Sequence, residues 1–186
     1  MRIIGGIHKG KNIFQPIDKT TRPLRDLVKE SIFNLINHSN TINVEIKESN
    51  ILDLFAGSGS FGLECISRGS NNVTFVESNY NAIVILKKNI NKLKLKNKIQ
   101  IIQKDCFKYL DNEIRDINKF DIIFIDPPYK EKKINDIIIK IKEKNILKEN
   151  GVIIIHRHKK DSLNISDKFS LIDIRIYGIS KILIGY

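Results

Sequence analysis

Short apolar segments alternate with amphipathic segments between residues 50 and 156, and this alternation limits the fold more than any other feature of the chain. The apolar segments are typical of strands and span residues 50–55, 72–77, 98–103, 120–126 and 151–156. The segments between them are typical of helices and span residues 60–69, 81–93, 107–114 and 134–145. This order predicts a parallel sheet with helices on both faces. Strands that are apolar at every position fit a sheet covered on both sides.

The two ends of the chain add to this plan. Residues 169–186 are typical of two strands about a turn at Tyr177 and Gly178, which predicts an antiparallel pair at one edge of the sheet. The predicted fold class is therefore α/β, with the Rossmann-like seven-stranded sheet of class I S-adenosylmethionine-dependent methyltransferases. Residues 1–40 form an extension, with a small hairpin in "MRIIGG" and "KNIFQP" and a helix over residues 24–36.

A glycine-rich turn follows the first predicted strand, in "LDLFAGSGSFG". Glycines let the backbone turn tightly and approach a ligand closely, and ligands of open α/β sheets bind at the carboxyl ends of the strands. Dehydrogenases carry similar glycines, so this spacing is weak evidence alone. Asp53, four positions before Gly57, would repel a pyrophosphate and suits a ligand with an ammonium or sulfonium charge.

Further carboxylates follow the next two strands. Glu77 ends the second strand and is placed to hold both ribose hydroxyls, and Asp105 follows the third, where it could accept from an adenine amino group. Asp105 alone could instead be a helix N-cap or a surface charge. Carboxylates at three consecutive strand ends together outline S-adenosylmethionine. The residues predicted to bind this cofactor are Asp53, Phe55, Ala56, Gly57, Ser58, Gly59, Glu77, Ser78, Asp105, Cys106 and Asp126.

The fourth strand ends in the sequence "DPPY", residues 126–129, which we predict to be catalytic. Pro127 forces Asp126 into an extended conformation, and the two prolines remove two N–H donors, which ends strand pairing and leaves carbonyls free. An exocyclic amine of a base could donate to Asp126 and to the Pro127 carbonyl, which would orient its lone pair toward a methyl group. Tyr129 offers a face for stacking on the base. The predicted catalytic residues are Asp126, Pro127, Pro128 and Tyr129.

These motifs resemble the RsmD-like methyltransferases, which modify N2 of one guanine in bacterial 16S ribosomal RNA. "MRIIGG" with "KGK", "TRPLRDLVKESIFNLI", "LDLFAGSGSFGLECISRG", "FIDPPY" and "YGISKILIGY" all carry the resemblance, which covers nearly the whole chain. It implies guanine-N2 methylation of 16S rRNA during small-subunit maturation. The chain departs from the family pattern at Arg25, which replaces a polar residue. It also departs at His156, where relatives are expected to have an acidic residue.

The charge of the chain indicates a polyanionic partner. The formal net charge is +11, and a small basic enzyme commonly acts on nucleic acid. Residues 1–25 hold six basic residues against Asp18 alone. We predict that the extension, residues 1–40, binds RNA while residues 41–186 form the methyltransferase domain, although a solvated surface is the alternative. The predicted RNA-binding residues are Arg2, Lys9, Lys11, Arg22 and Arg25.

Other functions and settings can be weighed against this interpretation. An adenine-N6 methyltransferase acting on DNA or RNA would also use DPPY, and it remains the alternative. DPPY has no role in a nicotinamide-dependent dehydrogenase. The presence of DPPY together with the residues predicted to bind the cofactor argues against a non-catalytic RNA-binding module. Cys65 and Cys106 have no CxxC spacing, which favours a reduced cytoplasmic protein without zinc. We expect no metal, no signal peptide, no membrane span and a monomer.

Overall fold

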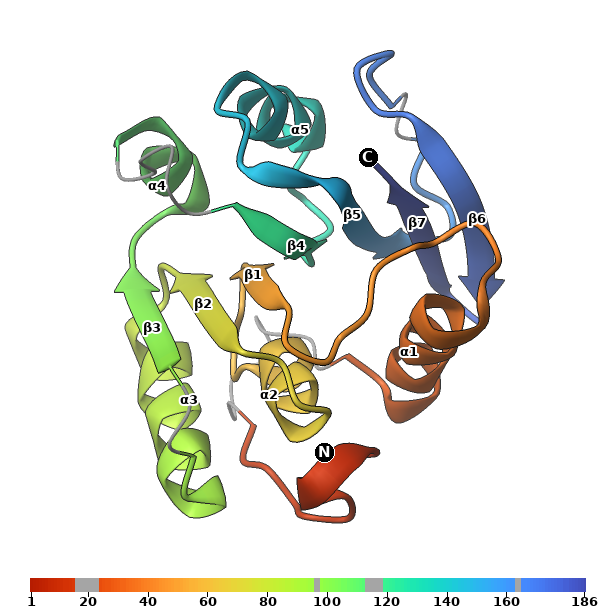
Figure 1. Cartoon of the computed structure of the whole chain (residues 1–186). Coiled ribbons are helices and arrows are strands. Elements are labelled where there is room, and N and C mark those ends of the chain that lie inside the picture. The colour runs from red at the N-terminus through yellow and green to blue at the C-terminus, as the bar shows by residue number, and fades with distance from the viewer. Residues whose placement is uncertain (16–23, 96–97, 113–118, 163–164) are drawn as a thin grey trace.

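A seven-stranded sheet with helices on both faces makes up the computed structural model, which describes residues 1–15, 24–95, 98–112, 119–162 and 165–186 (Figure 1). The strand order is β3-β2-β1-β4-β5-β7-β6. Neighbours from β3 to β5 are parallel, and β7 is antiparallel to both β5 and β6. The strands are β1 (Asn50–Leu54), β2 (Asn72–Glu77), β3 (Lys98–Gln103), β4 (Phe120–Ile125), β5 (Leu147–His158), β6 (Leu171–Tyr177) and β7 (Ser180–Gly185).

The helices divide between the two faces of the sheet, as Figure 1 shows. On one face, α1 (Asp26–His38), α2 (Ser60–Ser67) and α3 (Tyr80–Leu93) share an apolar cluster with every second residue of the central strands. On the other, α4 (Cys106–Asn112) and α5 (Ile134–Glu143) cover the alternate residues. Because side chains alternate across a strand, fully apolar strands supply both cores at once. The predicted fold class is confirmed.

Strand and helix bounds follow the predicted ones closely, with β5 as the exception. This strand was predicted at residues 151–156 and spans residues 147–158 in the structure. Its first residue, Leu147, pairs with Phe120 of β4, and a register shift separates this pair from the rest of the β4–β5 pairs. Its last residue, His158, pairs with Ser180 of β7. The extra residues at its carboxyl end carry His158 past the end of β4, to the edge of the sheet where the DPPY motif lies.

The extension packs against the main domain rather than forming a core of its own. Phe33 of α1 stacks on Phe61 of α2 at 5.4 Å between ring centroids, and Phe61 stacks on Phe124 of β4 at 4.1 Å. The predicted hairpin at the amino end is reduced to one antiparallel bridge, between Arg2 and Asn12, around a short 3-10 turn, η1 (Gly6–His8). The division of the chain at residue 40 stays a prediction.

Polar contacts anchor this bridge to the helices beneath it. Lys29 of α1 is fully buried, donates to the Arg2 carbonyl at 2.6 Å and pairs with Glu64 of α2 at 3.4 Å. Glu64 also accepts from the Ile4 N–H at 2.8 Å. Burial lowers the pKa of Lys29, and the neighbouring Glu64 partly offsets this. Because each buried charge has partners, these contacts hold the backbone at Arg2 and Ile4 against α1 and α2.

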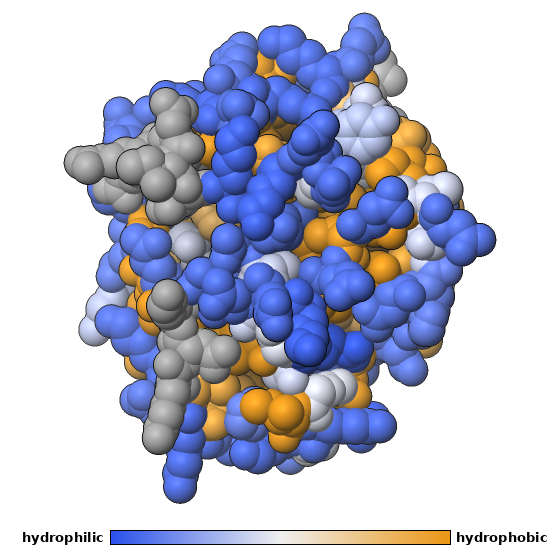
Figure 2. Space-filling model, in the orientation of Figure 1, coloured by the Kyte–Doolittle hydropathy of each residue, from blue (hydrophilic) through white to orange (hydrophobic). Residues whose placement is uncertain are grey.

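Hydrophilic side chains cover most of the face seen in Figure 2, and apolar side chains gather toward its right side. The edge strand β6 has partly exposed apolar residues, namely Leu171, Ile174 and Ile176. No helix among the described residues is long and apolar enough to cross a membrane.

Candidate active site

The glycine turn predicted after β1 connects it to α2 in a conformation that requires glycine. Phe55, Gly57 and Gly59 all have positive φ angles, of 59°, 55° and 82°. A Cβ atom on Gly59 would lie 2.4 Å from the Leu86 side chain of α3, so the turn is pressed against that helix. Ala56 and Ser58 are buried within it. The turn therefore brings backbone, rather than side chains, to the carboxyl end of β1.

Asp53 lies within β1 and is only 1% exposed. Its Oδ2 accepts a hydrogen bond of 3.0 Å from the Gly62 N–H in the first turn of α2. Burial raises the pKa of Asp53 well above its ordinary value, the Gly62 N–H opposes this, and the nearby Asp126 and Glu77 carboxylates raise it further. Two predicted site carboxylates thus lie close enough to Asp53 to repel it, and a cation between them would relieve that repulsion.

Glu77 ends β2 and ties together the loops that follow β1 and β2. The Gly57 N–H donates to its Oε2 at 2.7 Å, and the Asn79 N–H donates to its Oε1 at 2.7 Å. A carboxylate has about four lone-pair sites, so both oxygens retain capacity to accept from ribose hydroxyls. Ser78, the next residue, is exposed.

Asp105 caps the helix that follows β3, which was the alternative role considered for it. Its Oδ1 accepts from the Phe107 N–H at 3.0 Å and from the Lys108 N–H at 3.2 Å. Cys106 lies in the apolar core under α4, and burial raises the pKa of its thiol. A ligand at this position would therefore meet the backbone of Cys106 rather than its side chain. The cofactor roles of both residues stay predictions.

Asp126 follows β4 directly, and its side chain is 21% exposed. Its Oδ1 lies 2.8 Å from Nδ1 of His156, and Nε2 of His156 lies 2.9 Å from Oγ of Ser180. Tyr129 packs edge-on to His158, with 5.2 Å between ring centroids, and to His156 at 6.5 Å. The DPPY motif thus lies against the carboxyl end of β5, where the rings of His156 and His158 pack beside Tyr129.

Arg157 holds the loop that follows Asp126, a role that sequence reasoning missed. This side chain is 1% exposed and donates to the carbonyls of Pro128 at 3.2 Å, Tyr129 at 3.1 Å and Glu131 at 2.9 Å. It also forms an ion pair with Asp161. The prediction that carbonyls of the motif are free is therefore wrong for Pro128 and Tyr129, because a buried cation needs them as acceptors. The role of the Pro127 carbonyl stays a prediction.

The comparison with protein families places the whole chain, residues 1–186, in the family described as "Conserved hypothetical protein 95". The chain belongs to this family. It corresponds to the RsmD-like family that the motifs resemble, so the resemblance is confirmed. S-adenosylmethionine is the cofactor of the family and of its fold class.

Two individual relatives match over most of their length, and a third shares the fold over part of its length. Ribosomal RNA small subunit methyltransferase D of Haemophilus influenzae is 32% identical over 180 residues, which cover 96% of this chain and 90% of the relative. The solved structure of yhhF from Escherichia coli superposes with a TM-score of 0.83 at 25% identity, covering 100% of this chain and 96% of that one. SMU.776, solved in complex with SAH, has the same fold, with a TM-score of 0.63 at 20% identity and coverage of 83% and 50%.

The predicted RNA-binding residues of this family member lie on the surface where they are described. Lys9, Lys11 and Arg25 are exposed, and Arg2 is 62% exposed while pairing with Asp26 at 3.1 Å. Arg22 lies outside the described residues. Their RNA-binding role stays a prediction.

The η1 turn, which leads into Lys9, lies beside the carboxyl end of α2, where the His8 N–H donates to Ser67 Oγ. The glycine turn, at the carboxyl end of β1, is at the other end of this helix. Eight residues of α2 correspond to about 12 Å, so the η1 turn and the glycine turn lie at opposite ends of a helix of that length.

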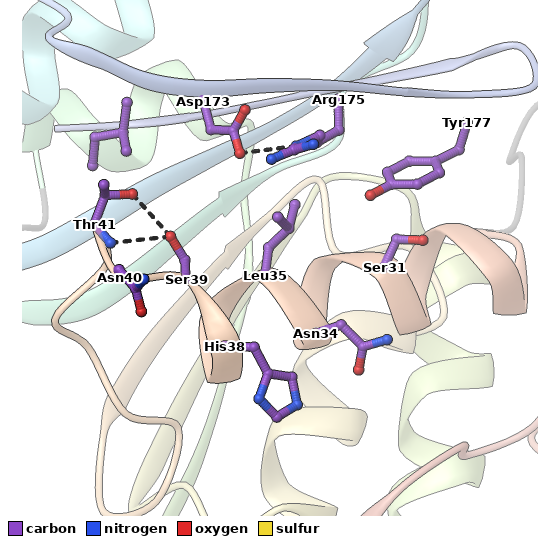
Figure 3. A pocket seen from close by; sticks show the side chains of 11 residues that line it. Ser31, Asn34, Leu35, His38, Ser39, Asn40, Thr41, Asp173, Arg175 and Tyr177 are labelled. Carbon is purple, nitrogen blue, oxygen red and sulfur yellow. Dashed lines mark hydrogen bonds and ion pairs between the residues drawn. The ribbon is translucent and has the colours of Figure 1, made fainter.

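A surface groove of about 660 Å³ lies apart from these residues, between α1 and β6 (Figure 3). Side chains from the two elements face each other across it, and Arg175 and Asp173 pair on β6 at 2.9 Å. None of the predicted site residues lines it. In the part of the chain that the structure describes, no three His, Cys, Asp or Glu side chains are arranged to hold a metal ion.

Proposed function

We propose that this chain methylates the exocyclic N2 of a specific guanine in 16S ribosomal RNA, with S-adenosylmethionine as methyl donor, in the cytoplasm during maturation of the small ribosomal subunit. The observation that carries the proposal is the half-buried Asp126 carboxylate, held at the carboxyl end of β4 between two rigid prolines and the buried His156. Family membership and the name of the Haemophilus influenzae relative support rRNA as the substrate.

The described residues fit the proposed cofactor on the chemistry of their donor set. Asp53, Glu77 and Asp126 gather carboxylates beside the glycine turn, and their mutual repulsion contributes to the raised pKa of Asp53. Such a cluster suits a cation and disfavours a pyrophosphate. Glu77 would hold the ribose, Asp105 the adenine and the carboxylates near Asp53 the methionine end. When bound, the cofactor supplies an electrophilic methyl group on a sulfonium.

Asp126 would act on the substrate amine by accepting a hydrogen bond from one N2–H. This contact orients the nitrogen lone pair, which is otherwise delocalised into the purine ring, so positioning supplies much of the rate enhancement. Tyr129 would stack on the base, a contact worth about 1–3 kcal/mol. After methyl transfer the amine carries a positive charge and is acidic, so its proton leaves to Asp126 or to water.

The basic surface would bind the RNA outside the target base. Lys9, Lys11 and Arg25 are exposed and positioned to neutralise phosphates, whose contacts dominate affinity without reading sequence. If the target guanine is paired, it must first leave the stack, at a cost of a few kcal/mol.

The proposal is tested by mass spectrometry of nucleosides from 16S rRNA, isolated from cells with and without the gene. Loss of N2-methylguanosine in the deletion, and its return with the wild-type gene but not with Asp126→Ala, is the expected result. Loss of N6-methyladenosine instead would favour the adenine-N6 alternative. An unchanged set of modified nucleosides would contradict both.

A further inference from the structure

We propose that His156 is a positioning residue. It holds Oδ1 of Asp126 in a hydrogen bond, so that Oδ2 can accept a hydrogen bond from the substrate amine. The inference rests on the proposed function, but its structural part can be tested without any substrate. It assigns a role to one of the two residues at which the sequence predicts a departure from the family pattern.

The sheet register brings the two side chains together. Ile125 of β4 pairs with Ile155 of β5, so Asp126 and His156 follow at equivalent positions on neighbouring strands and on the same face. The Oδ1–Nδ1 distance is 2.8 Å, and the imidazole is 5% exposed. Ser180 of β7, 4% exposed, closes the other side of the ring with its Oγ 2.9 Å from Nε2.

The chemistry of these groups determines which atoms donate. An ionised carboxylate only accepts, so Nδ1 of His156 must carry the proton that it donates to Asp126. In neutral imidazole Nε2 is then unprotonated, and it accepts from the Ser180 hydroxyl. If the ring gains a second proton, the hydroxyl rotates and accepts instead. Both contacts therefore survive either state of the ring, and Asp126 keeps the same geometry.

This arrangement holds the carboxylate from two directions. Pro127 restricts the backbone of Asp126 to an extended conformation, and the His156 contact restricts its side chain. The remaining oxygen can then be presented to the base without loss of rotamer freedom on binding. Asp126 contacts the imidazole directly, with Asp53 beyond it, and the ring of Tyr129 packs edge-on to the imidazole at 6.5 Å; His158 follows on the same face of β5.

A pair of substitutions separates positioning from packing. His156→Leu keeps an apolar side chain in the space but removes the donor, and we expect kcat for rRNA methylation to fall about 10- to 100-fold. His156→Asn places an amide N–H near the position of Nδ1, and we expect it to retain kcat within about threefold of the wild type. The KM for RNA and the affinity for S-adenosylmethionine should stay within about twofold in both, because neither variant removes a proposed binding contact.

The outcome against the inference is equally specific. Wild-type kcat in His156→Leu, or equal losses of kcat in the Leu and Asn variants, would show that the donated hydrogen bond has no part in positioning. Chemical denaturation of all three proteins identifies any loss that comes from unfolding.

Nitrogen-15 NMR of the histidine rings tests the assignment without substrate. The His156 signals, identified by their absence in His156→Asn, should show Nδ1 protonated and Nε2 unprotonated at a pH where the ring is neutral. The opposite tautomer would overturn the inference. If the wild-type protein methylates no guanine in rRNA, the proposed function is wrong, and the NMR result still tests the His156–Asp126 contact. If it methylates guanine and His156→Leu has the wild-type kcat, only the inference is wrong.

Discussion

Three of the carboxylates predicted to bind the cofactor also organise the protein. Asp53 accepts from the Gly62 N–H, Glu77 from those of Gly57 and Asn79, and Asp105 caps α4. One carboxylate can serve both roles, because it accepts several hydrogen bonds and its contacts with the protein set its orientation before a ligand binds. Substitutions at these positions will therefore change loop geometry as well as affinity.

Asp126→Ala should abolish methyl transfer and should weaken S-adenosylmethionine binding far less, because the Asp53 and Glu77 carboxyl groups remain beside the glycine turn. Asp126→Asn should retain more activity, since the amide oxygen still accepts from N2 if the ring of His156 changes tautomer and accepts from the amide. The Ser180 hydroxyl permits this change, because it can then accept from Nε2. Single-turnover rates with rRNA measure the ordering. An Asn variant as inactive as the Ala variant, with intact folding and cofactor affinity, would show that the negative charge itself is required.

Asp53→Asn should change the pH dependence of stability. The folded-state pKa of Asp53 is raised, so the wild type loses stability as pH rises from about 4, the ordinary Asp value, through that raised pKa. An Asn at this position cannot ionise, while its oxygen can still accept from Gly62. The free energy of unfolding of the variant should therefore increase relative to that of the wild type as pH rises. Bound S-adenosylmethionine should stabilise the wild type more than the variant. Thermal unfolding across this range, with and without S-adenosylmethionine, is the measurement; parallel curves would contradict the argument.

The long strand β5 lies between β4 and β7 and extends past the end of β4 to the loop that follows Asp126. Its last three residues alternate, so that His156 and His158 face the DPPY motif on one side while Arg157 reaches the loop carbonyls on the other. A strand that ended at residue 156, as predicted, would supply the first of these contacts and not the others. The extension of β5 is therefore what holds the loop after Asp126.

Arg157→Met should destabilise the protein by at least about 2 kcal/mol, because three carbonyls and Asp161 lose a charged, buried donor. The methyl-transfer rate should fall further than stability alone explains, since the loop that carries Tyr129 loses its anchor. Urea denaturation and single-turnover kinetics measure the two effects. Arg175→Met, on the exposed edge strand with one ion pair to Asp173, is the matched control and should change stability by less than about 1 kcal/mol. Equal effects in the two variants would refute the role of Arg157.

The formal net charge is +11, and exposed lysines lie both near the amino end and on α3. The proposed RNA site uses those near the amino end. A double variant, Lys9→Gln with Lys11→Gln, should weaken RNA binding and reduce the salt slope, by about 1.4 for two phosphate contacts on single-stranded RNA. The control pair, Lys87→Gln with Lys88→Gln on exposed positions of α3, removes the same charge. RNA affinity measured at several salt concentrations compares them. Equal slopes in both doubles would place the RNA surface elsewhere.

Much of the architecture could be predicted because its signals are local. The period of the apolar residues marks the strands and helices, and Gly57, Gly59 and the two prolines of DPPY each restrict the backbone wherever they occur. The predicted bounds of β2 and β3 agree with the structure to the residue. The hairpin at the amino end was overestimated because isoleucine favours strands even where only one bridge forms.

The sequence alone determined the sheet and its switch from parallel to antiparallel strands, because strands and short connections follow from local patterns. It also predicts that a ligand binds at the carboxyl ends of the parallel strands. Only the tertiary structure decided that His156 meets Asp126, that Arg157 binds the loop carbonyls and that Lys29 pairs with Glu64 beneath the amino-terminal residues. The partners in these contacts lie 26 to 35 residues apart in the chain. Such contacts exist because a buried polar group must find a partner once water is excluded, and which partner is near depends on packing and register that no local pattern encodes.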